Sequence, residues 1–122
     1  CLGVEERIAF GVPLIPLTSF AQMSQDFEAL VGEDAAMRAR HKRAIASLCS
    51  PIDPLARRCL IDPDHVMILA GKFDGVLSPH QSRTLAQHLG CELVHFEGGH
   101  LLQRGRRPAL DRALDMAQRA CA

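Results

Sequence analysis

The stretch that decides the fold is VMILAGKFD, residues 66–74. Its first half is a continuous apolar run bounded by turn residues, which is typical of a central strand in a parallel sheet. A short loop separates this strand from the best-specified helix of the chain. Ser78 predicts the N-cap, Pro79 the first helical position and Gly90 the end, and Gln81 has the spacing of a capping box. The sequence therefore predicts a strand, a loop and a helix in this order.

The same order follows a second time. Residues 92–96 predict another strand, residues 98–100 lie in a glycine-bearing loop, and a closing helix begins at Pro108. The first of the two helices is expected to face inward with Leu85, Ala86 and Leu89, and the closing helix carries Leu110, Leu114 and Ala117. Strands that alternate with helices pair in parallel through right-handed crossovers, so the predicted fold class is α/β.

Two helices and a turn are predicted before this unit. The first runs from Ser19, which has capping-box spacing to Gln22, as far as Gly32, and the second covers about 34–48. Residues 55–59 leave room for one short helical turn between prolines. The helical stripes are Met23, Phe27, Leu30 and Val31 in the first helix and Met37, Ala44, Ile45 and Leu48 in the second, with the basic residues Arg38, Arg40, Lys42 and Arg43 largely off the stripe.

The beginning of the chain is an almost wholly apolar run. Residues 7–15 suit a strand buried on both faces, which Pro13 is expected to end. The chain starts at Cys1 rather than Met and enters this run without a polar lead-in. We therefore expect the sequence to be the middle of something longer, and we expect its apolar edge to face water when the chain is alone.

Composition excludes several classes of protein. A chain of 122 residues with 14 basic and 14 acidic side chains describes one globular domain at most. Zero net charge, with five Phe and no Trp or Tyr, argues against a nucleic-acid partner. Glycine and prolines break the longest uncharged stretch, Ile8 to Gln25, so no membrane span is predicted. The five widely spaced cysteines contain no Cys-x-x-Cys motif, which predicts reduced thiols in the cytoplasm.

Two polar residues follow the predicted parallel strands. Asp74 follows the strand at 66–70, and His100 follows the strand at 92–96. If the strands are neighbours, both loops rise from the same sheet edge, where catalytic groups collect in such sheets. A carboxylate beside an imidazole is the pairing that nucleophilic acyl transfer needs. Two alternatives stay open, because Asp74 also fits the Asp-Gly corner of a hairpin and His100 taken alone fits a solvated loop.

Other polar residues have simpler interpretations. Glu97 is expected to be an exposed side chain, and His80 and His88 lack a third ligand for a metal site. No cofactor or metal is therefore predicted. Three arginines, at positions 104, 106 and 107, precede a helix N-terminus and so oppose its dipole. They form either a solvated surface or a place for an anion on a substrate or partner.

Residues 64–121 resemble the C-terminal part of an α/β-hydrolase. The resemblance rests on VMILAGKFD at 66–74, Pro79-His80-Gln81, the following helix, and the run from Cys91 to His100. It implies that Asp74 is the triad acid and His100 the triad base. It also implies that residues 7–17 are the strand after the nucleophile and about 18–60 a helical cap. The whole chain, 1–122, is then a partial domain with the acid and histidine unit at 64–122.

The chain departs from this family at the nucleophile. No Gly-x-Ser-x-Gly motif occurs, so a nucleophilic serine is expected upstream of Cys1. One hypothesis is that the chain is the C-terminal segment of a serine hydrolase acting on an ester or related acyl substrate. The alternative is a non-catalytic α/β fragment that serves as an interaction or assembly module. The expected partners are a small acyl molecule and either the missing N-terminal half or a second copy at the exposed sheet edge.

Overall fold

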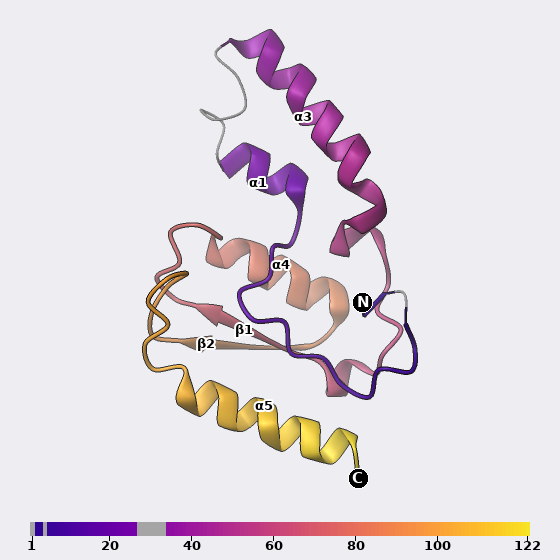
Figure 1. The fold of residues 1–122 in the computed structure, drawn as a ribbon, viewed down its shortest axis with the longest axis vertical. Coiled ribbons are helices and arrows are strands. Elements are labelled where there is room, and N and C mark those ends of the chain that lie inside the picture. Colours follow the sequence, from indigo (N-terminus) through magenta and orange to yellow (C-terminus); the bar gives the residue numbers. More distant parts are fainter. Residues whose placement is uncertain (1, 4, 27–33) are drawn as a thin grey trace.

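A computed structural model describes residues 2–3, 5–26 and 34–122 (Figure 1). The named elements are, in chain order, α1 (Phe20–Asp26), α3 (Ala35–Cys49), three short 3₁₀ turns η1 (Ser50–Ile52), η2 (Pro54–Ala56) and η3 (Pro63–His65), β1 (Met67–Gly71), α4 (Pro79–Leu89), β2 (Glu92–Phe96) and α5 (Arg107–Ala120). The fold is mixed α/β around a small parallel sheet, which agrees with the fold class expected from the sequence.

The sheet consists of β1 and β2 paired in parallel. Met67 lies opposite Glu92 at one end of the register, and Gly71 lies opposite Phe96 at the other. Every residue of β1 is buried, as the continuous apolar run predicts for a strand covered on both faces. The α4 crossover that joins the two strands confirms the predicted strand, helix, strand order.

Helices cover the two faces of this sheet. Figure 1 shows α4 on one face and α5 on the other. Ile68 packs with the buried Leu85 and Leu89 of α4, whereas Leu69 packs on the opposite side with Met116 of α5. Each such apolar side chain contributes about 1.5–3 kcal/mol when it is fully buried. Most of the apolar core of the described residues is therefore in this three-layer unit.

The ends of α4 lie where the sequence predicts them. Ser78 is the N-cap, Pro79 the first helical residue, and Gly90 ends the helix with a φ of +69°. The hydroxyl of Ser78 makes no capping hydrogen bond, so the predicted capping box is wrong. Gln81 is instead fully buried, and its backbone carbonyl accepts a hydrogen bond of 2.9 Å from Thr18 Oγ1.

The buried face of α5 differs from the stripe expected from the sequence. Ala109, Ala113 and Met116 face the sheet, whereas Leu110 and Leu114 are exposed. The buried stripe begins one residue earlier than the leucine stripe. Small alanines at the contact let a helix backbone approach a sheet closely, whereas leucines on that face would hold it away.

The predicted strand at 7–15 is wrong as a regular strand. The segment lies beside β1 in parallel but forms only isolated bridges, Gly11 with Val66 and Leu14 with Leu69. Pro13 has no N–H to give, so the ladder loses a bond at this position. Both Phe10 and Leu14 are exposed, so the segment is not buried on both faces either.

The helices α1 and α3 contact each other beyond α4, on the side away from the sheet (Figure 1). Asp34 caps α3 by accepting a hydrogen bond of 2.7 Å from Met37 N. No residue of α3 is buried, and Leu48 of its predicted stripe is 79% exposed. Part of the first predicted helix, from residue 27 to 33, lies outside the described residues. None of the helices described is long and apolar enough to span a membrane.

Candidate active site

The carboxylate of Asp74 is buried directly after β1. Its side chain is 2% exposed, and its Oδ1 accepts hydrogen bonds of 2.8 Å from the backbone N–H groups of Val76 and Leu77. The chain then enters α4 without a return strand, so the hairpin alternative for the Asp-Gly pair is wrong. The two backbone donors fix the plane of the carboxylate and leave Oδ2 for another partner.

That partner is the imidazole of His100, in the loop after β2. His100 Nδ1 lies 3.2 Å from Asp74 Oδ2, and the His100 side chain is 36% exposed. The predicted contact between the two loops is therefore present. With Nδ1–H donating to the carboxylate, Nε2 is the ring nitrogen left to accept a proton. Nε2 makes no hydrogen bond within the described part of the chain.

Close glycine packing brings the two loops together. A Cβ on Gly71 would lie 2.9 Å from the Gly98 carbonyl oxygen, and one on Gly99 would lie 2.4 Å from the Phe73 carbonyl oxygen. Both distances are too short for a side-chain carbon, so each position needs a glycine. A backbone hydrogen bond of 2.8 Å from Phe73 N to Gly98 O joins the loops at this crossing. The Asp74–His100 pair thus rests on backbone contacts as well as on its own hydrogen bond.

A hollow of about 430 Å³ opens beside His100. Its apolar lining includes Phe73, Leu101 and Leu102, which are 73%, 88% and 74% exposed. Val76 and the glycines of the loop complete most of the wall. His100, whose Nδ1 contacts the buried carboxylate of Asp74, is therefore itself part of the lining of a mostly apolar hollow. Sequence patterns do not indicate the exposed apolar residues Phe73, Leu101 and Leu102, since apolar side chains in a loop have no periodicity.

The remaining predicted polar residues fall outside the Asp74–His100 contact. Glu97 is exposed as expected and forms an ion pair with Lys72. Arg106 donates to Gln103 Oε1 at 2.7 Å, while Arg104 is part of the lining of the hollow.

The other histidines and the cysteines lie elsewhere. His88 Nε2 donates to the Arg57 carbonyl at 2.7 Å, and His80 is exposed at the start of α4. Residues 2–3, 5–26 and 34–122 contain no group of three potential metal ligands. Burial raises the pKa of the Cys91 thiol to about 11, with a further contribution from nearby Cys59. A thiol with a raised pKa is a poor nucleophile at neutral pH.

None of the six serines of the chain is hydrogen-bonded to His100 in the described structure. Ser19 instead donates to Asp53 Oδ2 at 2.9 Å, and Ser24 donates to the Ala21 carbonyl at 2.7 Å. The described residues therefore place an imidazole beside a buried carboxylate, without a serine hydroxyl hydrogen-bonded to that imidazole.

Comparison of the chain with models of protein families, with curated proteins and with solved structures finds no match.

Proposed function

We propose that the chain supplies the acid and the base of a serine-hydrolase site that cleaves an ester or a related acyl substrate. The observation that carries the proposal is the contact of 3.2 Å between His100 Nδ1 and the buried Oδ2 of Asp74. A carboxylate on Nδ1 selects the tautomer in which Nε2 accepts protons, and it stabilises the imidazolium that follows. The resemblance to the C-terminal part of an α/β-hydrolase points to the same pair.

The proposed reaction needs a serine from outside residues 1–122, either upstream in a longer chain or in a second polypeptide. The serine Oγ attacks the carbonyl carbon while its proton passes to His100 Nε2. The proton then passes to the leaving alkoxide, and the C–O bond to that group breaks. In the second half, His100 takes a proton from water as the water oxygen attacks the acyl-enzyme. The proton returns to serine Oγ when the acid leaves.

The apolar hollow favours an apolar acyl or alcohol group in the substrate. Phe73, Leu101 and Leu102 lie on the loops that carry the acid and the base, so a group bound to them is close to His100. Burial of their exposed surface against substrate contributes about 25 cal/mol per Å² of apolar area. In this proposal α1 and α3 are the helical cap, and residues 64–122 are the unit that holds the acid and the base.

The test uses the chain together with the polypeptide that supplies the serine, because all proposed groups are then present. Asp74→Asn is expected to lower turnover of p-nitrophenyl butyrate by up to about 10⁴-fold, and His100→Ala by at least as much. Asp111→Asn and His80→Ala are matched controls at exposed positions and should leave turnover within about twofold. Near-normal turnover in both site variants would contradict the proposed roles.

The second candidate is a non-catalytic interaction or assembly module. Its specific support is the exposed apolar surface, which includes Leu48, Ile52 and Leu101 in addition to the segment beside β1. The turnover assay and a measurement of assembly on a sizing column together separate the two candidates. The interaction module is favoured if changing these apolar residues abolishes assembly while Asp74→Asn and His100→Ala leave turnover as in the wild type.

A cytoplasmic location belongs to the proposal as well. Cys49, Cys59, Cys91 and Cys121 are free thiols in the described structure. Thiols persist in a reducing compartment, whereas secreted proteins of this size commonly pair them.

A further inference from the structure

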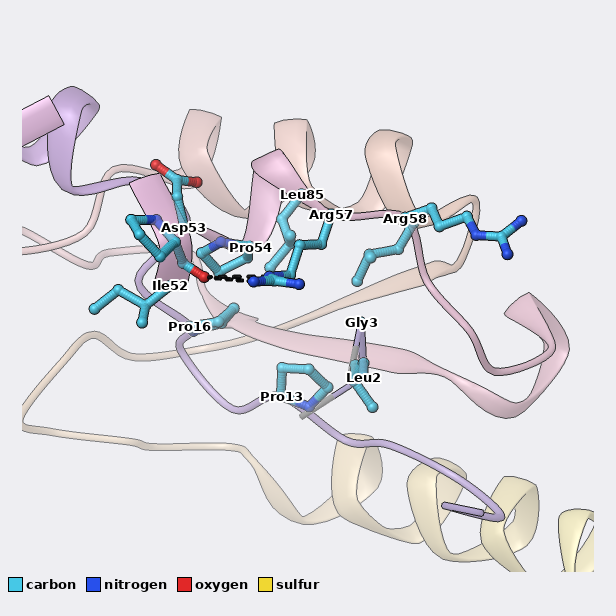
Figure 2. A pocket seen from close by; sticks show the side chains of 12 residues that line it. Leu2, Gly3, Pro13, Pro16, Ile52, Asp53, Pro54, Arg57, Arg58 and Leu85 are labelled. Atoms are coloured by element: carbon cyan, nitrogen blue, oxygen red, sulfur yellow. Dashed lines mark hydrogen bonds between the residues drawn. The ribbon is translucent and has the colours of Figure 1, made fainter. Parts of the chain in front are cut away.

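A second cavity, of about 360 Å³, lies between the start of the chain and the segment that returns from α3 (Figure 2). It shares no lining residue with the hollow at His100. Its walls are mostly apolar and come from separate parts of the chain, namely Leu2, Gly3, Pro13 and Pro16 on one side, Pro51, Ile52 and Pro54 on the other, and Leu85 and Leu89 of α4. The volume lies within the range typical of small-molecule sites.

The guanidinium of Arg57 projects into this cavity (Figure 2). Its Nε and Nη2 donate to the Pro51 carbonyl at 3.2 and 3.1 Å, and this contact holds the head group in place. Nη1 makes no hydrogen bond within the described residues. The backbone of Arg57 is held as well, because His88 Nε2 donates a hydrogen bond to the Arg57 carbonyl. Gly3 has no side chain and so leaves room for the aliphatic part of the Arg57 side chain.

Asp53 also lines the cavity, but both of its carboxylate oxygens already accept hydrogen bonds. Asp53 Oδ1 accepts from Leu55 N at 2.9 Å, and Oδ2 accepts from Ser19 Oγ at 2.9 Å. In Figure 2 the Asp53 carboxylate points away from the Arg57 guanidinium. Arg57 forms no ion pair with any described residue. The neighbouring Arg58 lines the same cavity, but its guanidinium extends away from that of Arg57 (Figure 2).

We infer that this cavity binds a small molecule with an apolar body and a single carboxylate, of the medium-chain fatty-acid class. The proline and leucine walls take the hydrocarbon, and the free N–H groups of Arg57 take the carboxylate. A guanidinium recognises a carboxylate through charge-assisted hydrogen bonds, which are stronger than neutral ones. The site is independent of the proposed hydrolase reaction, since no residue is common to the two.

The test is equilibrium dialysis of the chain with labelled octanoate, a method that does not require a monomer. We expect saturable binding of octanoate, with octanol bound at least tenfold more weakly because it lacks the charge that Arg57 recognises. Arg57→Gln should weaken octanoate binding by about 10- to 100-fold. Arg58→Gln is the matched control and should change binding by less than about threefold.

A second variant tests the site without changing Arg57. Ile52 is exposed at the cavity wall, so Ile52→Asp should fold normally while placing a competing carboxylate near the guanidinium. It should weaken octanoate binding more than octanol binding, because both ligands lose the apolar contact with Ile52 but only octanoate is repelled by the new carboxylate. Absence of saturable octanoate binding, equal loss in both arginine variants, or equal competition by acetate and octanoate would each overturn the inference.

Discussion

Two substitutions of Asp74 separate its contribution to folding from its contact with His100. Asp74→Ala leaves the N–H group of the partly exposed Val76 and that of the buried Leu77 without their acceptor, because both bond Oδ1 at 2.8 Å. Each unsatisfied buried donor costs about 1–3 kcal/mol, so the alanine variant should lose about 3 kcal/mol of unfolding free energy. Asp74→Asn keeps a carbonyl oxygen in the place of Oδ1 and should lose only about 1 kcal/mol.

Urea unfolding of the variants measures this difference. With a slope of about 1–3 kcal/mol per M, a loss of 3 kcal/mol lowers the midpoint by about 1–3 M. Asp111→Ala removes an exposed carboxylate on α5 and serves as the control, with a shift below about 0.5 kcal/mol. Nitrogen NMR of the His100 ring reports the other role, since Asp74→Asn should reduce the population with hydrogen on Nδ1. Equal midpoints for the alanine and asparagine variants would refute the assignment of the two backbone bonds to Oδ1.

Three further outcomes are expected. Gly99→Ala should destabilise the chain by about 1–3 kcal/mol and separate Asp74 from His100, because its Cβ would lie 2.4 Å from the Phe73 carbonyl oxygen; a normal urea midpoint would contradict this. The chain alone should elute from a sizing column as an assembly, and Leu14→Lys should shift it toward monomer, whereas a wild-type monomer would argue against an exposed edge. The free energy of unfolding should fall as pH rises from about 9 to 11, because the folded state keeps the Cys91 proton that the unfolded state releases. Urea unfolding at several pH values measures this fall, which Cys91→Ala should reduce.

The parallel unit and its polar pair could be predicted because local signals agree with one another. The run at 66–70, Pro79 and Gly90 each favour the same boundaries, and the crossover then places the ends of both strands at one edge. The meeting of Asp74 and His100 follows from that topology, since each residue lies just beyond a strand end.

The sequence-based predictions are wrong where contacts between distant parts of the chain determine the local structure. Apolar content alone predicted a regular strand at 7–15, but the missing N–H of Pro13 interrupts its ladder. The leucines of the last helix have helical spacing, yet Ala109 and Ala113 face the sheet because smaller side chains permit a closer approach. The cavity at Arg57 joins segments far apart in the sequence, and no local pattern indicates it.

The glycine crossing between the two loops has a consequence for protein engineering. Phe73 N and Gly98 O fix the path of the backbone, and the side chains of Phe73, Leu101 and Leu102 project outward from it into solvent. Replacing these three side chains removes no buried contact and leaves the glycines in place. These three positions can therefore be randomised in a library to change what the surface recognises, while Asp74 and His100 keep their relative positions.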